Sequence, residues 1–220
     1  MKREIITTAD GSSTIHLADW DETYHSRHGA IQEAYHVFIK NGLSLLNRPT
    51  LSILEIGFGT GLNAFITLLE GSKKKTNIHY TGVEAYPVVE NEIGKLNYLQ
   101  VLHAEDHALE FNQMHTSDWE RDIPISTRFV LHKQKKDFAT ISDIEKYDLV
   151  YYDAFGARVQ PELWAEPLFL IMFNAMKPGG VLVTYAAKGS VRRAMQSVGF
   201  TVERLPGPPG KREMMRATKP

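Results

Sequence analysis

The sequence contains no cysteine among its 220 residues. That absence excludes a disulfide framework, a thiol nucleophile and cysteine metal ligands, and it suits a reducing compartment. The sequence also lacks any run of about 18 uncharged apolar residues, and its first residues, Met1-Lys-Arg-Glu-Ile-Ile, contain no apolar signal region. We therefore expect a soluble, cytoplasmic protein without a membrane partner.

A large excess of charge of either sign is missing too. Lys and Arg number 25 and Asp and Glu number 26, so the formal net charge is −1. This balance argues against a protein that coats nucleic acid indiscriminately, although a local concentration of charge can still bind it. At this length we predict one domain, residues 1–220, that buries roughly 70% of its unfolded surface.

What the chain does contain is a glycine turn between a strand and a helix. An apolar run at residues 51–54 has the length of a buried strand, and residues 64–70 have helical spacing. Between them, Gly57, Gly59 and Gly61 permit positive backbone angles and let a ligand lie against the main chain at the helix N-terminus. The turn therefore predicts a bound ligand.

The spacing of these glycines narrows the kind of ligand. A dinucleotide fingerprint is G-x-G-x-x-G, but its third glycine is replaced here by Leu62. An acid, Glu55, stands two residues before the first glycine, which resembles the first motif of class I S-adenosylmethionine-dependent methyltransferases. Another nucleotide and a purely structural glycine turn remain as alternatives.

Acidic residues end four of the predicted core strands. Ligands of open α/β sheets bind at the carboxyl ends of the strands. Glu84 lies 23 residues beyond Gly61, close to the spacing of about 20 that separates the glycine turn from a ribose-binding acid in such sheets. We predict that Glu84 accepts hydrogen bonds from a ribose and Asp137 from an adenine amino group; a solvent-exposed strand end is the alternative for Glu84. The four acids are Glu55, Glu84, Asp137 and Asp153.

The predicted fold is α/β: a Rossmann-like, mostly parallel, seven-stranded sheet. An N-terminal extension or lid, residues 1–45, holds a hairpin around Asp10-Gly11 and a helix at 31–41, and the core follows at 46–220. A helical insertion with helices near 91–102 and 104–114 follows the second core strand. Further core strands are expected at 77–83, 128–132, 147–153 and 181–185, and a helix ending at 176 precedes the last of these.

Two histidines and a basic tail complete the candidate residues. His103 and His107 stand four apart, a spacing that can bind metal on a helix, but no further ligand pattern accompanies them, so we predict a polar helix face and no metal. Residues 186–220 contain eight basic and two acidic side chains, a local excess of +6. We predict a phosphate-binding edge there, against the alternative of a solvated surface. Its proposed contacts are Arg192, Arg193, Lys211 and Arg212.

Taken together, these segments resemble the MnmC-like methyltransferase family over nearly the entire chain. Members of that family complete the 5-methylaminomethyl group on the wobble uridine of certain tRNAs. The segments that carry the resemblance are Tyr24-His-Ser-Arg-His-Gly-Ala-Ile-Gln-Glu33, Glu55-Ile-Gly-Phe-Gly-Thr-Gly-Leu-Asn63, Asp153-Ala-Phe with Pro161-Glu-Leu-Trp164, Val191-Arg-Arg with Gly199-Phe200, and Gly210-Lys-Arg-Glu-Met214.

The resemblance implies a role for each site residue. Glu55, Gly57, Gly59, Gly61 and Asn63 would hold the methionine part of S-adenosylmethionine. Asp153 would hold the acceptor amine or help its proton leave, and Phe155 would wall the path of the methyl group. Tyr24, Phe155 and Trp164 could receive the splayed base, and Arg158 belongs to the loop that contacts the RNA.

Two departures from the family pattern affect these expectations. Many members have proline at the place of Gly156 or Ala157 and lysine near Arg158, so the substrate loop is expected to differ in shape. Bifunctional members continue into a flavin-dependent oxidase domain, whereas this sequence resembles the stand-alone form, so we expect no flavin. A class I methyltransferase for a small amine metabolite, and a noncatalytic module that binds S-adenosylmethionine or RNA, are the rival functions.

Overall fold

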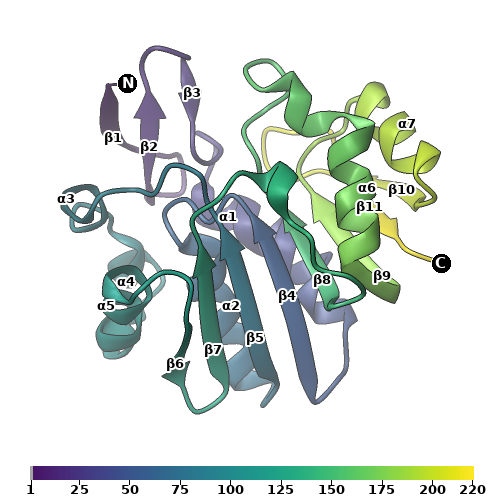
Figure 1. The fold of residues 1–220 in the computed structure, drawn as a ribbon. Coiled ribbons are helices and arrows are strands. Elements are labelled where there is room, and N and C mark those ends of the chain that lie inside the picture. The colour runs from purple at the N-terminus through teal and green to yellow at the C-terminus, as the bar shows by residue number, and fades with distance from the viewer. Residues whose placement is uncertain (1) are drawn as a thin grey trace.

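The computed structural model describes residues 2–220, which form a large and a small β-sheet. The large sheet has eight strands in the order β10-β11-β9-β8-β4-β5-β7-β6, and the small one has the order β1-β2-β3. Helices cover both faces of the large sheet (Figure 1). This is the Rossmann-like α/β arrangement that the sequence predicts.

Most of the elements are short. The strands are β1 (Arg3–Thr7), β2 (Ser13–Leu17), β3 (Glu22–Thr23), β4 (Thr50–Ile56), β5 (Asn77–Val83), β6 (Asp122–Ser126), β7 (Phe129–Gln134), β8 (Tyr147–Tyr152), β9 (Met176–Thr184), β10 (Thr201–Pro206) and β11 (Glu213–Thr218). The helices are α1 (Ala30–Ala34), η1 (Tyr35–Lys40), η2 (Leu43–Leu45), α2 (Leu62–Lys73), α3 (Glu90–Ile93), α4 (Tyr98–Val101), η3 (Glu105–His107), α5 (Ala108–Thr116), η4 (Phe138–Thr140), η5 (Pro161–Trp164), α6 (Glu166–Ala175) and α7 (Gly189–Ser197).

The central strand β4 divides its apolar side chains between the two faces of the sheet. Leu51 and Ile53 pack into the cluster that includes side chains of α1, η1, α2 and α5. Leu54 and Ile56 pack into the opposite cluster, with side chains of α6 and α7. A strand covered on both faces reads as a continuous apolar run rather than an alternating one, which is the pattern that predicted this strand.

The strand register brings the predicted acids to one edge of the sheet. β4 pairs in parallel with β5, with Glu55 opposite Gly82, and in parallel with β8, with Glu55 opposite Tyr151. β5 pairs in parallel with β7. The carboxyl ends of β4, β5, β7 and β8 therefore lie together.

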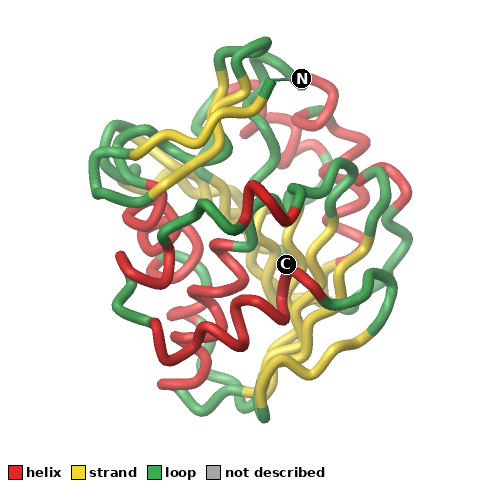
Figure 2. The backbone as a smooth tube through the Cα atoms, turned by 90° about the vertical axis from the view of Figure 1, so that its left-hand side faces the viewer, coloured by secondary structure: helices red, strands yellow, loops and turns green. Residues whose placement is uncertain are grey.

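The N-terminal extension (residues 2–45) lies beyond that edge. Its small sheet sits at one end of the large sheet in both views (Figures 1 and 2). Arg3 forms an ion pair of 2.9 Å with Glu92, and Asn97 Oδ1 accepts hydrogen bonds from Ser13 N and Oγ at 2.8 and 2.9 Å. These contacts fasten the small sheet to the segment that follows β5.

The structure differs from the prediction in several details. The large sheet has eight strands, one more than predicted, because Asp122–Ser126 adds an antiparallel edge strand beside β7. This segment does not read as a strand in the sequence because it contains Pro124, and proline is tolerated in sheets only at such edges. The helical insertion is broken into short pieces, with His103 in the left-handed region at φ 50°. The predicted helix at 31–41 begins as α1 and continues as a π-helix.

The predicted end of the helix at 176 agrees with the structure to one residue, but the predicted start of the next strand at 181 was wrong. α6 ends at Ala175 and β9 begins at Met176, five residues before the predicted start of that strand. The pairing of β8 with β9 is irregular between Tyr147 and Leu149. Gly179 has a φ of 73°, so the glycines bend the early part of the strand instead of only ending the helix. Within residues 2–220, none of the helices has the length and apolar character to cross a bilayer.

Candidate active site

A cleft with a volume of about 1460 Å³ opens at the carboxyl ends of the parallel strands. Its remaining walls come from the N-terminal extension, from residues 154–164 after β8, and from the C-terminal segment. The cleft brings together all of the predicted site residues except Gly61, Arg192 and Arg193. Segments that are distant in the sequence thus share one space.

The glycine turn forms one wall of this cleft. Gly57, Gly59 and Gly61 have φ values of 90°, 51° and 72°, which favour glycine. A Cβ atom at Gly57 would lie 2.9 Å from the carbonyl oxygen of Asp153, and one at Gly59 would lie 3.2 Å from Cδ1 of Tyr24. At these positions glycine is therefore favoured for two reasons: the backbone angle is positive, and there is little space for a Cβ atom.

The turn is also held by hydrogen bonds from the neighbouring strand. The backbone N–H groups of Gly57 and Phe58 both donate to the Val83 carbonyl, at 3.0 and 3.1 Å. Gly59 N donates to Glu84 Oε2 at 3.1 Å, and Tyr86 N donates to Glu84 Oε1 at 2.9 Å. Each carboxylate oxygen of Glu84 keeps a further lone pair that can accept from a ligand.

Asn63 joins the buried carboxyl group of Glu55 and the partly buried one of Asp153 on the floor of the cleft. Its Nδ2 donates to Glu55 Oε1 at 2.9 Å and to Asp153 Oδ2 at 2.8 Å. Glu55 is 1% exposed, and its Oε2 has no hydrogen-bond partner within residues 2–220. A buried, unpaired carboxyl oxygen is costly. The buried Tyr80 hydroxyl lowers the pKa of Glu55, but it too has no partner within hydrogen-bond distance among residues 2–220, so Glu55 Oε2 can accept from a ligand.

Burial shifts the ionisation of both carboxyl groups. It raises the pKa of Glu55 well above the usual value for a glutamate. Burial also raises the pKa of Asp153 to about 7, with the negative charge of Glu33 adding to the effect and the Asn63 hydrogen bond and the Lys211 charge opposing it. A carboxyl group with a pKa near neutrality can both accept and release a proton at physiological pH.

Asp137 stands on the side of the cleft formed after β7. Its carboxylate caps the short helix η4 by accepting a hydrogen bond of 2.8 Å from Ala139 N. Glu84, on the neighbouring strand end, lines the same side. This side of the cleft therefore offers two carboxylates, held by local backbone contacts, to a ligand with hydroxyl or amino groups.

Aromatic rings form the opposite wall. The ring of Phe155 stands edge-on to Tyr24 at 5.0 Å and to Trp20 at 5.8 Å between centroids. Burial raises the pKa of Tyr24 to about 12, so its hydroxyl stays protonated. Trp164 is only 4% exposed, and its Nε1 donates to the Phe155 carbonyl at 2.7 Å. Trp164 thus supports the loop from beneath, while Tyr24 and Phe155 face the cleft.

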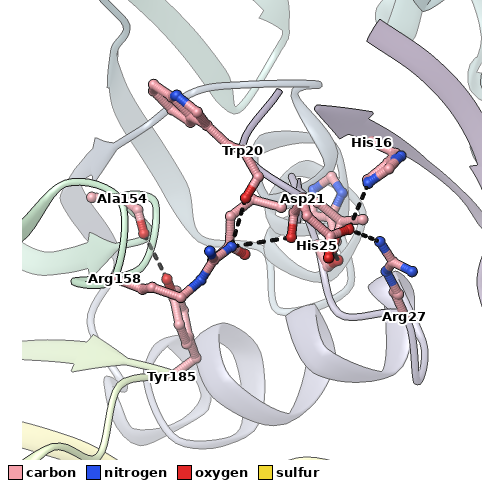
Figure 3. Close-up of polar contacts among 10 residues, drawn as sticks. His16, Trp20, Asp21, His25, Arg27, Ala154, Arg158 and Tyr185 are labelled. Carbon is pink, nitrogen blue, oxygen red and sulfur yellow. Dashed lines mark hydrogen bonds and ion pairs between the residues drawn. The ribbon is translucent and has the colours of Figure 1, made fainter. Parts of the chain in front are cut away.

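Arg158 fastens the loop after β8 to the N-terminal extension, as Figure 3 shows. Its Nη2 donates to the carbonyl oxygens of Trp20 and Asp21 at 2.7 and 3.1 Å, and its Nε donates to Glu22 Oε1 at 3.1 Å. The guanidinium predicted to contact RNA is therefore occupied by three acceptors of its own chain. Asp21 is itself held by Arg27, at 3.1 Å.

His25 ties the extension to the glycine turn. Its Nδ1 lies 3.0 Å from Thr14 Oγ1 and its Nε2 lies 3.3 Å from Thr60 Oγ1. Burial lowers the pKa of His25 to about 4, so the ring is neutral at physiological pH. The sequence shows His25 only as part of a polar loop, and no spacing links it to Thr60.

The eight basic side chains of residues 186–220 divide into those that form ion pairs and those that do not. Four of its cations form ion pairs: Lys211 with Glu33, Arg204 with Glu213, Arg216 with Glu203, and Lys219 with Glu145. The other four have no carboxylate partner within residues 2–220. Lys188 and Arg212 of these line the cleft, and Arg192 and Arg193 lie outside it on α7.

The structure adds cleft residues to which the sequence assigned no role. Glu33 and Tyr185 both line the cleft, and Trp20 and Glu22 lie across from the loop after β8. Glu33 ends the segment 24–33 that carries part of the family resemblance, and the other three lie in segments that read as an ordinary strand, hairpin or loop. For metal ions, residues 2–220 show no cluster of three or more histidine, aspartate or glutamate side chains that could act as ligands.

Comparisons with known proteins agree with this geometry. A family model described as S-adenosyl-L-methionine-dependent methyltransferase matches residues 105–220. The chain is 29% identical, over 89% of its length, to the "tRNA 5-methylaminomethyl-2-thiouridine biosynthesis bifunctional protein MnmC" of Hydrogenovibrio crunogenus, and 30% identical over 89% to that of Leptospira borgpetersenii. It covers 31% and 32% of those proteins, about a third of their length.

A solved structure shows the same fold over the whole chain. The crystal structure of MNMC2 from Aquifex aeolicus superimposes with a TM-score of 0.81 at 25% sequence identity, covering 100% of this chain and 71% of the other. The similarity therefore includes the N-terminal extension as well as the core.

Proposed function

Since this chain belongs to the family of S-adenosyl-L-methionine-dependent methyltransferases, we propose that it methylates the primary amine of 5-aminomethyl-(2-thio)uridine at the wobble position of tRNA. The products are the 5-methylaminomethyl base and S-adenosylhomocysteine. The observation that carries the proposal is the likeness, over 89% of the chain, to proteins named for 5-methylaminomethyl-2-thiouridine biosynthesis. The proposal concerns the methyl transfer alone and uses neither a flavin nor a metal ion.

The floor of the cleft fits S-adenosylmethionine. Glu55 Oε2 is buried without a donor, and an ammonium group such as that of the methionine part supplies one. Gly57 and Gly59 leave space where a Cβ atom would intrude. We propose that Glu55, the glycine turn including Gly61, and Asn63 hold the methionine part. Glu84 would bind the ribose and Asp137 the adenine.

When bound, S-adenosylmethionine supplies a methyl group made electrophilic by its sulfonium. The residues of the chain then have to place the acceptor amine in line with that methyl group and keep water away, an effect of orientation that supplies several kcal/mol, roughly 7–11 in favourable cases. Phe155, packed against Tyr24 and Trp20, would exclude water from this path.

Asp153 is proposed to handle the proton. The amine attacks only in its neutral form, and after the transfer its nitrogen carries a positive charge and one proton too many. A carboxyl group with a pKa of about 7 takes up such a proton near neutral pH and stabilises the positive charge while ionised. Asn63 would keep the Asp153 carboxyl facing the acceptor through its 2.8 Å hydrogen bond.

The tRNA would approach from the basic side of the cleft. Arg192, Arg193 and Arg212, together with Lys188, have no carboxylate partners among the described residues and are proposed to meet phosphates of the anticodon stem-loop. The wobble base has to leave its stack to reach Asp153, and aromatic rings that line the cleft, such as Tyr24 and Phe155, favour a splayed base.

The proposal is tested with methyl-labelled S-adenosylmethionine and bulk tRNA from cells that lack this methylation. Label is expected in 5-methylaminomethyl nucleosides after digestion, and tRNA from cells that carry out the modification should accept little. Label in small amines but not in tRNA would instead indicate a metabolite methyltransferase. Binding of S-adenosylmethionine without transfer to either would indicate a noncatalytic module.

A further inference from the structure

We infer that Lys211 donates a hydrogen bond to the C4 carbonyl oxygen of the acceptor uracil, and that Glu33 holds its ammonium group in place for this contact. The inference rests on the proposed function and deepens it. It makes Lys211 a specificity-determining residue and Glu33 a positioning residue, and it restricts the acceptor to pyrimidines with a carbonyl at C4.

The ammonium group of Lys211 is fixed by two partners. Its Nζ lies 2.5 Å from Glu33 Oε2 and 3.8 Å from the centre of the Tyr185 ring. Glu33 is 7% exposed, and its other carboxylate oxygen accepts a hydrogen bond of 3.1 Å from Ser26 N. An ammonium group has three donors, and in this arrangement one points to the carboxylate and the ring face takes up another direction. One donor is left for a ligand in the cleft, which both Lys211 and Glu33 line.

This environment is unsuited to a phosphate contact. The Lys211–Glu33 pair has no net charge, and its carboxylate would repel a phosphate placed beside it. The next residue, Arg212, is exposed, lines the cleft and has no carboxylate partner within residues 2–220. Phosphate contacts depend on net positive charge and counterion release, so Arg212 suits that role and Lys211 suits a directed hydrogen bond to a neutral acceptor.

Lys211 and Glu33 line the same cleft as Asp153. Their charges act in opposite directions on the pKa of the Asp153 carboxyl, Glu33 raising it and Lys211 lowering it. The Tyr185 ring beneath Lys211 is anchored by its hydroxyl, which donates to the Ala154 carbonyl at 2.8 Å (Figure 3). Thus the residue that follows Asp153 and the ring that supports Lys211 belong to one rigid frame.

The chemistry of the acceptor matches that frame. In 5-aminomethyluracil, the aminomethyl carbon and the C4 carbonyl stand on adjacent ring atoms. When the amine faces Asp153, the C4 oxygen therefore lies beside it, where a donor is required. In cytosine an amino group replaces this oxygen, and its hydrogens would face the Lys211 ammonium, donor against donor.

The test uses two synthetic anticodon stem-loops that carry 5-aminomethyluridine or 5-aminomethylcytidine at the wobble position. For each, kcat/KM is measured with wild-type protein, Lys211→Met and the matched control Arg212→Met. The wild type should prefer the uridine by at least about tenfold, because a site built around one hydrogen-bond pattern rejects the opposite one. In Lys211→Met this preference should fall to within about threefold, with the salt dependence of binding unchanged.

The control separates this role from phosphate binding. Arg212→Met should weaken binding of both stem-loops equally and flatten the salt dependence, leaving the preference intact. Because Lys211→Met leaves the Glu33 charge buried alone, the double variant Glu33→Gln/Lys211→Met is measured beside it and should show the same loss of preference with cooperative thermal unfolding.

Two results would overturn the inference while leaving the proposed function in place. One is a wild-type preference that survives in both Lys211 variants. The other is a flattened salt dependence in Lys211→Met, which would make Lys211 a phosphate contact. If wild-type protein transfers no methyl group to the uridine stem-loop or to tRNA, the proposed function itself is wrong and the inference falls with it.

Discussion

The two halves of the cleft are assembled from different parts of the chain. The proposed cofactor half, formed by Glu55, the glycine turn, Glu84 and Asp137, consists of main chain and strand ends that follow one another in sequence. The proposed acceptor half, formed by residues 20–33, residues 153–164, Tyr185 and Lys211, gathers side chains from four distant segments. Asn63 belongs to both halves, because its side-chain amide donates hydrogen bonds to Glu55 and to Asp153. The first half is therefore set by the fold, and the second depends on how the extension is fastened to it.

The largest effect that separates the two halves is expected from Gly59→Asp. Gly59 has a φ of 51°, and a Cβ atom added there would lie 3.2 Å from Tyr24. Its backbone N–H donates a hydrogen bond to Glu84. A new carboxylate here meets a crowded space and another acid, so affinity for S-adenosylhomocysteine should fall at least about 100-fold, or roughly 2.7 kcal/mol. Isothermal calorimetry measures the loss.

Gly179→Asp is the matched control for that change. Gly179 has a similar φ of 73°, but a Cβ atom added there would meet no other atom within 4 Å, and the residue lies away from the cleft. The Gly179→Asp variant should be less stable, because aspartate is strained at this backbone angle, but it should keep its affinity for S-adenosylhomocysteine. Undiminished binding in Gly59→Asp would remove the glycine turn from the cofactor half.

Asp153→Asn should break the acceptor half while leaving the cofactor half intact. The side chain keeps its shape, and its Oδ1 can still accept from Asn63, but the carboxyl group that is proposed to take up the proton is gone. Removing a positioned acid–base group commonly costs 10²–10⁴ in rate, so single-turnover methylation of saturating tRNA should fall by about two decades or more with both ligands still bound.

Glu162→Gln provides the comparison for that measurement. Glu162 is an exposed acid of the same loop and also lines the cleft, and its loss should alter the single-turnover rate far less. If Asp153→Asn methylates within about threefold of wild type, orientation is sufficient for the transfer, and Asp153 serves only to bind the amine.

The same division explains what could be predicted from the sequence. The glycine turn and the four acids were predictable, because strand ends meet at one edge of a parallel sheet and the turn has a characteristic spacing. The fold class was confirmed for the same reason. These features depend on neighbours in sequence or on strand order, both of which hydrophobic patterns reveal.

The acceptor half could not be predicted in this way. The Lys211–Glu33 pair joins residues 178 positions apart, and the contacts of Arg158 reach 136 to 138 positions back. No periodicity encodes such pairs. The sequence therefore predicted a basic segment of charge +6 where the structure pairs four of eight cations with carboxylates.

The paired and unpaired cations should differ in their effect on RNA binding. Replacing Arg192 and Arg193 by glutamine should flatten the dependence of log K on log salt by about 1.8, at roughly 0.9 per duplex phosphate contact. The control replaces Arg204 and Arg216, whose charges Glu213 and Glu203 already balance, and should change the slope less. Equal slopes in wild type and the Arg192/Arg193 variant would make α7 an ordinary solvated surface.

The smallest effect concerns stability and tests the environment of Asp153 without any ligand. Burial raises the pKa of its carboxyl to about 7 from an ordinary value of 3.8. An acid whose folded pKa is raised favours folding in its protonated form, so its contribution is most favourable at low pH and is lost as pH rises through about 7. Asp153→Asn removes this penalty, because asparagine does not ionise. The Tm of the variant relative to wild type should therefore increase between pH 5 and pH 8, by about 2–4 °C for each kcal/mol involved. Differential scanning calorimetry of both proteins in the same buffers measures this difference. A Tm difference that stays constant over this range would mean that the carboxyl is well solvated, and would remove the physical reason for assigning it the proton.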